Sequence, residues 1–258
     1  MELTVPVKDG GVWAEDTGGE GLPLVLLHPG VASSRIWDAI MPRLTERHRV
    51  IRYDVRGFGR SAAPTAQYSL AGDLLAVIDH FEVDRAVFVG SSMGGAAALS
   101  FALDAPERVA GLALFCPGVT GDPDLQSAEL LAGIGELAQK GDTEGIVALG
   151  LRTWGAAGTG DDPEAAAQLR AAIPGWFSNL GRQVPDPDAF GRLGEITAPC
   201  LLALGELDQS EMIRSNEAVA ARIPGCRLVR LPGSDHFPSL REPERVAQLT
   251  LELYDSVS

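Results

Sequence analysis

The sequence feature that most constrains the fold of this chain is a short turn of the pattern G-x-S-x-G, residues 90–94, with Ser92 at its centre. The turn directly follows the apolar stretch 87–89, which we expect to be a buried strand, and precedes the small-residue stretch 96–103, which we expect to be a helix. A serine on such a sharp turn has a strained backbone that lifts its hydroxyl clear of the sheet, above the helix N-terminus. With 30 glycines in the chain the pattern alone is weak, but this context predicts that Ser92 is a nucleophile and that Ser91 is not.

A histidine is needed to activate this serine, because a serine hydroxyl is a weak nucleophile unless a base takes its proton. The chain has four histidines. His236 lies in a loop between the last predicted strand and the final predicted helix, at the sheet edge where functional residues concentrate. His48 and His80 have polar neighbours typical of solvated side chains, and His28 ends the first buried strand. His236 is therefore the predicted base.

The base needs a carboxylate that holds its tautomer and stabilises the imidazolium. Asp208 follows the predicted strand 200–204 and lies at the same sheet edge, one strand before His236. Glu206 is a weaker alternative because it lies closer to the strand end, and Asp235 adjoins the histidine, where neighbouring side chains seldom face each other. The predicted chain order is thus serine, aspartate, histidine.

An oxyanion that forms on the substrate needs two backbone N–H donors. Met93 follows the predicted nucleophile and offers one of them. The second is expected from loop 28–31, after the first buried strand, where Pro29 has no N–H. Gly30 is the first choice and Val31 the second, and we expect the histidine at the start of this loop to order it by a side-chain hydrogen bond.

The rest of the chain alternates short apolar runs with amphipathic stretches, which predicts an α/β protein with a mostly parallel sheet and helices on both faces. The predicted strands are 24–27, 50–53, 86–89, 109–115, 200–204 and 227–231. The predicted helices outside the central part of the chain are 70–81, 96–103 and 243–254.

The central segment 118–194 has helical patterns and no convincing strand. Its expected helices are 124–140, 142–154 and 163–173, followed by chain breaks at Pro174, Pro185 and Pro187, with a flexible connector at 155–160. The sequence therefore predicts a core domain of residues 1–117 and 195–258 and a helical cap of residues 118–194 over one end of the sheet. The alternative is a packing subdomain with no role in substrate binding.

Five stretches occur in a fixed order along the chain: 27–30 (LHPG), 53–61 (YDVRGFGRS), 90–95 (GSSMGG), 205–208 (GELD) and 233–238 (GSDHFP). Together they resemble the α/β-hydrolase superfamily, over roughly residues 3–117 and 195–256. The resemblance implies the α/β-hydrolase fold, a mostly parallel central sheet with helices on both faces and a helical cap insertion. Within the serine hydrolase branch, the chain is similar to small carboxylesterases and enol-lactonases.

Two details refine this resemblance. Asp54, Arg56 and Ser61 match a stretch that in this family shapes the turn after a strand and rarely does chemistry, and we interpret them in that way. Pro29 stands where many members have glycine, which affects the usual hydrogen bonding of the oxyanion loop. Because Ser92 occupies the position where haloalkane dehalogenases and epoxide hydrolases of this fold have aspartate, those two activities are not expected.

Large apolar side chains near these motifs are candidates for a substrate pocket. They are Trp154, Trp176, Phe177 and Leu180 in the central segment, and Val31, Trp37 and Phe237 near the oxyanion and histidine loops. The alternative for the aromatic residues of the central segment is that they pack a helix onto the core. An apolar pocket predicts an apolar or uncharged acyl substrate.

Charge and cysteine content narrow the partners further. The net charge of −14 disfavours nucleic acid and anionic membrane surfaces as partners. We find no apolar run of the roughly 18 residues that span a bilayer and no visible signal peptide, so we expect a cytoplasmic protein. Cys116, Cys200 and Cys226 are far apart and show no metal-binding spacing, so we expect buried apolar cysteines, no disulfide framework, no metal and no cofactor. The sequence does not indicate the oligomeric state.

These observations predict a serine hydrolase of the carboxylesterase or lactonase type (EC 3.1.1), which cleaves a carboxylic ester, lactone or thioester through an acyl-enzyme. Ser92 attacks the carbonyl carbon, His236 moves the proton and Asp208 orients His236, while Gly30 and Met93 hold the oxyanion. Two alternatives remain open from sequence. One is a lyase, acyltransferase or cofactor-free oxygenase of the same fold, and the other is a ligand receptor without catalysis.

Overall fold

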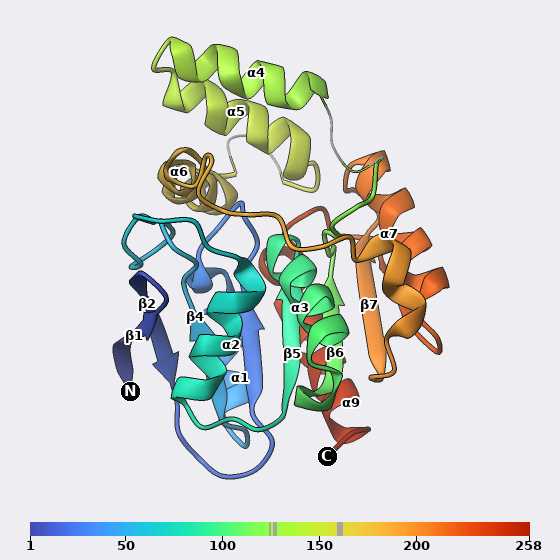
Figure 1. Cartoon of the computed structure of the whole chain (residues 1–258). Helices are drawn as coiled ribbons and strands as arrows, with labels where there is room; N and C mark the ends of the chain where they lie inside the picture. Colours follow the sequence, from blue (N-terminus) through green and yellow to red (C-terminus); the bar gives the residue numbers. More distant parts are fainter. Residues whose placement is uncertain (124, 126–127, 159–161) are drawn as a thin grey trace.

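A single mixed sheet organises the protein (Figure 1). The computed structural model describes residues 1–123, 125, 128–158 and 162–258. The strands are β1 (Glu2–Val7), β2 (Gly10–Asp16), β3 (Leu24–Leu27), β4 (Val50–Tyr53), β5 (Ala86–Ser91), β6 (Val109–Phe115), β7 (Cys200–Gly205) and β8 (Arg227–Leu231). Their spatial order is β1-β2-β4-β3-β5-β6-β7-β8, with parallel pairing from β4 through β8 and antiparallel pairing of β2 with β1 and β4. The predicted α/β class and mostly parallel sheet are confirmed.

Alternating side chains of the central strands pack into two hydrophobic cores, one on each face of the sheet. On β5, Phe88 belongs to one core, and Val87 and Val89 belong to the other. On β3, Val25 belongs to the same core as Phe88, and Leu24 belongs to the opposite core. Strands covered on both faces are continuously apolar, which is why these strands are recognisable in the sequence.

Helices cover both faces of the sheet (Figure 1). The core on one face includes side chains of α2 (Leu70–His80), α3 (Met93–Asp104) and α7 (Ser210–Arg222), and the core on the other face includes side chains of α1 (Met41–Thr45) and α9 (Pro243–Asp255). The shorter helical elements are η1 (Ser34–Trp37), η2 (Pro106–Arg108), η3 (Phe190–Glu195) and α8 (Pro238–Arg241). Among the described residues, no helix is long and apolar enough to cross a membrane.

The chain between β6 and β7 contributes α4 (Ala128–Gln139), α5 (Thr143–Trp154) and α6 (Pro163–Ser178). These helices lie beyond the carboxyl ends of the parallel strands (Figure 1). Asp124, where the first helix of this segment was predicted to begin, lies outside the described residues, as do residues 159–160 of the predicted connector. The Asp142 side chain caps α5 by accepting a hydrogen bond from the N–H of Gly145.

Helix α6 does not end at Pro174, and this corrects the sequence prediction. The helix continues through the proline to Ser178, although a proline inside a helix removes one backbone hydrogen bond. Contacts beyond the proline hold the last turn: the indole N–H of Trp176 donates to the carbonyl oxygen of Gly30 at 2.6 Å, and the Asn179 side-chain amide donates to the carbonyl oxygen of Arg56 at 2.8 Å. Tertiary contacts therefore outweigh the local preference of the proline.

Candidate active site

The predicted nucleophile lies on a sharp turn between β5 and α3. Ser92 has φ 47° and ψ −112°, a strained backbone conformation for a residue other than glycine. A Cβ atom on Gly94 would lie 2.2 Å from the carbonyl oxygen of Leu27, and a Cβ atom on Gly90 would lie 2.7 Å from the carbonyl oxygen of Gly94. Only glycine fits at either position, so the two glycines of the motif are what allow this turn to form.

A continuous chain of hydrogen bonds joins the three residues predicted to be catalytic. The Nε2 atom of His236 lies 2.9 Å from Ser92 Oγ, and its Nδ1 atom lies 2.7 Å from Asp208 Oδ2. The side chains of the histidine and the aspartate are each 1% exposed. With the Nδ1–H donating to the carboxylate, Nε2 is free to accept the proton of the serine hydroxyl.

The surroundings of His236 favour its charged form. Burial is the largest influence and lowers the pKa of the imidazole, but the nearby carboxylates of Asp208 and Asp235 outweigh it, so that the pKa is raised above its ordinary value. A base with a raised pKa accepts a proton readily, provided that the pH keeps it neutral.

The two alternative carboxylates make their hydrogen bonds and ion pairs with other residues. The Glu206 side chain is exposed and pairs with Arg230 at 3.4 Å. The Asp235 carboxylate is fully buried, and it accepts hydrogen bonds from the backbone N–H of Phe237 and from Arg241 at distances of 2.8–3.0 Å. Of the three candidate carboxylates, it is Asp208 that contacts His236.

The loop that carries His236 is attached to the helices between β6 and β7. The backbone N–H of His236 donates to the carbonyl oxygen of Trp154 at 3.1 Å, at the end of α5. The backbone N–H of Ala157 donates to Asp235 Oδ2 at 2.9 Å, and Arg241 binds both Asp235 at 2.8 Å and Asp162 at 2.5 Å. The position of the histidine loop therefore depends on this helical segment.

The predicted oxyanion loop lies next to the serine turn. A Cβ atom on Gly30 would lie 3.7 Å from the Cβ atom of Met93, which shows how closely the two backbones approach. Among the described residues, no acceptor is found for the backbone N–H of either residue. The His28 ring orders the loop as predicted: its Nδ1 bonds the carbonyl oxygen of Pro29 at 2.8 Å, and its Nε2 accepts from the N–H of Val55 at 3.0 Å.

The turn residues Asp54, Arg56 and Ser61 make hydrogen bonds and an ion pair that stabilise the local backbone. Asp54 accepts hydrogen bonds from the backbone N–H groups of Ser34 and Arg60, at 2.8 and 2.9 Å. Ser61 Oγ donates to the carbonyl oxygen of Asp54 at 2.6 Å, and Arg56 pairs with the buried carboxylate of Asp73 at 2.7 Å. These contacts agree with a structural role.

A cavity of about 270 Å³ opens beside Ser92 and His236. The other residues that line it are Gly30, Val31, Met93, Leu125, Leu130, Trp154, Trp176, Gln209 and Met212. Val31, Trp154 and Trp176 were predicted pocket residues, and all three line this cavity. The rings of Trp154 and Trp176 meet edge to face at 5.8 Å between centroids.

Four other predicted pocket residues do not line the cavity, which corrects the sequence prediction. Trp37 is fully buried in the core between the sheet and α9, and Phe237 packs into the same core. Phe177 and Leu180 are instead exposed to solvent, at 39% and 73%. For Trp37 and Phe237, proximity in sequence to the oxyanion and histidine loops did not determine where the side chains point.

Four lining residues were not predicted. Gln209 directly follows Asp208, and Met212 is in the first turn of α7. The only available signal was their position just after a strand at the functional edge of the sheet. Leu125 lies between β6 and α4, and Leu130 lies in the first turn of α4. Both fall in the predicted helix 124–140, whose pattern did not indicate which side chains reach the cavity.

The buried thiol of Cys116 lies against the same residues. Among the described residues, the side-chain atoms of Cys116, Asp208 and His236 that could bind a metal ion lie within 4.8 Å of one another. The aspartate and histidine already bond each other, and Cys116 Sγ accepts the backbone N–H of Gly205 at 3.4 Å. Burial raises the pKa of this thiol well above its ordinary value, so it stays protonated.

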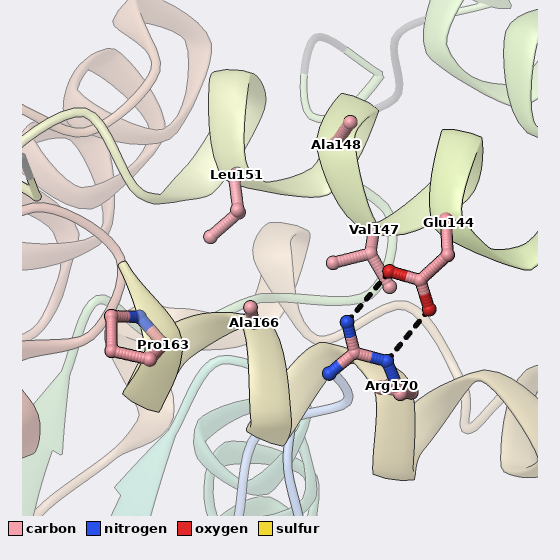
Figure 2. A pocket seen from close by; sticks show the side chains of 7 residues that line it. All are labelled: Glu144, Val147, Ala148, Leu151, Pro163, Ala166 and Arg170. Atoms are coloured by element: carbon pink, nitrogen blue, oxygen red, sulfur yellow. Dashed lines mark hydrogen bonds and ion pairs between the residues drawn. The ribbon is translucent and has the colours of Figure 1, made fainter. Parts of the chain in front are cut away.

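A second groove lies between α5 and α6 (Figure 2). Ser92 is not among the described residues that line it. Glu144 on α5 and Arg170 on α6 form a two-pronged ion pair across it, at 2.7 and 2.8 Å. The remaining lining residues are Val147, Ala148, Leu151, Pro163 and Ala166. No serine, cysteine, threonine or histidine is among these described lining residues.

Comparison with known proteins agrees with this fold. The model of the alpha/beta hydrolase family matches residues 24–249. The chain therefore belongs to the alpha/beta hydrolase family and is an enzyme of that family.

Three relatives illustrate the range of the family. The 2-hydroxymuconate semialdehyde hydrolase of Pseudomonas sp. (strain CF600) is 41% identical over 103 residues, and the match spans only 37% of this chain and 36% of that protein. The pimeloyl-(acyl-carrier protein) methyl ester esterase of Edwardsiella ictaluri (strain 93-146) is 30% identical over 244 residues, which cover 91% of this chain and 94% of that protein. Among solved structures, Est816, an N-acyl homoserine lactone degrading enzyme, superposes with a TM-score of 0.79 at 29% identity, covering 97% of this chain and 99% of that one.

Proposed function

We propose that this protein is a serine hydrolase that cleaves a carboxylic ester or lactone through an acyl-enzyme. The single observation that carries the proposal is the chain of hydrogen bonds from Ser92 through His236 to Asp208 at the wall of a cavity. The names of two relatives, a methyl ester esterase and a lactone degrading enzyme, support the same class of bond.

In the proposed mechanism, Ser92 Oγ attacks the substrate carbonyl carbon while His236 Nε2 takes the hydroxyl proton. Asp208 stabilises the imidazolium that results. The backbone N–H groups of Gly30 and Met93 bind the oxyanion of the tetrahedral intermediate. His236 then gives its proton to the leaving alkoxide, and an attacking water repeats the sequence to release the acid.

The cavity favours a small, neutral acyl group. Of the described residues that line it, none is lysine, arginine, aspartate or glutamate, and most are apolar. Its volume of about 270 Å³ lies just below the usual range for drug-sized ligands. A thioester with a small acyl group undergoes the same chemistry.

The segment 118–194 has the role of a cap in this proposal, and residues 1–117 and 195–258 form the hydrolase core. Trp154 and Trp176 bring side chains of the segment into the cavity, and the indole of Trp176 also holds the carbonyl oxygen of Gly30. These contacts favour a substrate-binding cap over a subdomain that only packs.

A fluorophosphonate probe tests the nucleophile without knowledge of the substrate. We expect a covalent adduct on Ser92, located by peptide mass spectrometry, and loss of labelling in Ser92→Ala and His236→Ala. Ser91→Ala is the matched control, because it alters the buried neighbouring serine and should retain the adduct. Absence of an adduct in the folded wild-type protein would overturn the proposal and favour a receptor or a cofactor-free oxygenase.

A further inference from the structure

Two of the three cysteines lie in contact, far from the proposed catalytic residues in the fold. The Sγ atoms of Cys200 and Cys226 are 3.5 Å apart. Cys200 begins β7, and Cys226 immediately precedes β8, whose first residue pairs with Leu201. The sequence predicted three separate buried cysteines. The structure corrects this, because Cys226 is partly exposed and the two thiols meet across neighbouring strands.

We propose that Cys200 and Cys226 form a redox modification site, at which a hydroperoxide oxidises the two thiols to a reversible intramolecular disulfide. Neighbouring strands lie about 4.7–4.9 Å apart, within the separation of about 4.4–6.8 Å that a disulfide spans between Cα atoms. Closing the bond requires only that the two sulfur atoms approach from their present contact. The proposal does not depend on the hydrolase activity.

The environments of the two thiols differ in a way that assigns them separate roles. Cys200 is 4% exposed, whereas Cys226 is partly open to solvent and therefore to an oxidant. The hydrogen bond between them lowers the pKa of Cys226 and raises that of Cys200. Because the thiolate is the reactive form, Cys226 is the attacking residue and Cys200 the resolving one.

The reaction balances with a hydroperoxide as the two-electron oxidant. The Cys226 thiolate attacks the peroxide O–O bond, which forms a sulfenic acid and releases hydroxide (or an alkoxide). The Cys200 sulfur then attacks the sulfur of the sulfenic acid, forming the S–S bond and releasing water. An added thiol returns both cysteines to the reduced state by exchange.

The two cysteines lie at the opposite end of the sheet from the proposed catalytic residues. Both cysteines lie at the amino ends of their strands, whereas Asp208 and His236 follow the carboxyl ends of the same two strands. β8 also lies at one edge of the sheet that the described residues form, so the bond fastens this edge strand to its neighbour β7. We therefore expect ester hydrolysis to change less than twofold when the bond forms.

Peptide mapping tests the proposal directly, because trypsin leaves each cysteine in a different peptide: 109–140, 193–214 and 223–227. The reduced, full-length protein is treated with hydrogen peroxide, blocked with iodoacetamide and digested without reductant. We expect peptides 193–214 and 223–227 to be joined, with a combined mass less two hydrogens, and to separate after dithiothreitol. The buried Cys116 in peptide 109–140 serves as an internal control and should remain a free thiol.

Two variants test the separate roles of the two cysteines. Cys226→Ser should leave Cys200 unoxidised, because the exposed attacking thiol is gone. Cys200→Ser should instead leave Cys226 as a sulfenic acid that a dimedone probe traps. A wild-type protein that forms only higher oxides of Cys226, or only disulfides between two molecules, would overturn the proposal, and so would a cross-link that includes Cys116.

Discussion

The backbone N–H of His236 donates a hydrogen bond to the carbonyl oxygen of Trp154 at 3.1 Å, and the two rings lie 6.5 Å apart. Trp154 ends helix α5, so the proposed catalytic base is held by a residue that also lines the cavity. The helical segment and the loop that carries His236 therefore cannot move independently without losing this bond.

The first prediction concerns pH. His236 acts as a base only when neutral, and its pKa is raised above the ordinary value of about 6.5 by the carboxylates around it. We expect kcat/KM for a neutral ester to fall as the pH decreases through a midpoint above about 6.5, measured between about pH 5 and about pH 9. A midpoint below the ordinary value would contradict the assignment.

Asp208→Asn is the matched variant for this pH profile. The change removes the carboxylate that most raises the pKa of His236, and burial then acts with less opposition. We expect the acid midpoint of fluorophosphonate labelling to move down in pH, and kcat to fall about a thousandfold or more. An unchanged midpoint would show that Asp208 does not control the titration.

A second prediction concerns the buried ion pair behind the histidine. Arg241→Gln leaves the fully buried Asp235 carboxylate without its cationic partner, and we expect a loss of about 3 kcal/mol in the free energy of unfolding. Urea denaturation measures this loss, and kcat should fall as well because the loop of His236 loses an anchor. Arg170→Gln is the control at the exposed ion pair of Figure 2 and should change neither quantity appreciably. Equal effects of the two variants would contradict the prediction.

A third prediction tests the serine turn. Gly94→Ala places a methyl group 2.2 Å from the backbone oxygen of Leu27, and we expect it to destabilise the protein by about 3 kcal/mol or more in urea denaturation. Gly135→Ala is the matched control on helix α4, where a Cβ atom meets nothing within 4 Å. It should stabilise the protein by about 0.5–1 kcal/mol. If both variants are equally stable, the close packing of the turn is refuted.

A fourth prediction concerns substrate choice. The side-chain nitrogen of Gln209 is buried at the cavity and has no hydrogen-bond partner within the described part of the chain. We expect Gln209→Leu to lower kcat/KM about tenfold for an ester whose acyl chain carries a hydroxyl or keto oxygen, because a bonded donor is lost. A simple alkyl ester of matched size should be hydrolysed as before. Met212→Leu is the control on the same wall, and a uniform effect of Gln209→Leu on both esters would show that this amide does not select substrates.

The central strands and the hydrogen-bonded trio of side chains were predictable for one physical reason. Strands buried on both faces are continuously apolar, and the polar residues that follow them meet at one edge of a parallel sheet. That rule brought Ser92, Asp208 and His236 together from positions far apart in the chain. Asp208 was preferred to Glu206 because Glu206 lies closer to the end of the strand.

The N-terminal hairpin and part of the cavity wall were not predictable in this way. On β1, Val5 is the only fully buried residue, and Pro6 weakens the strand pattern, so this edge strand has little apolar signal. The joining turn relies on Asp9, which adopts a left-handed conformation with φ 56°. Trp37 was misplaced for a different reason: the direction of a side chain depends on tertiary packing, which sequence proximity does not report.

The placement of the tryptophans gives the protein its own optical reporter. The chain has four, and two of them, Trp154 and Trp176, line the cavity with their rings in contact. Trp37 is shielded in the core, and Trp13 lies under the guanidinium group of Arg60, away from the cavity. Intrinsic fluorescence should therefore respond to occupancy of the cavity, so that ligand entry can be followed in real time without a chromogenic substrate or an attached dye.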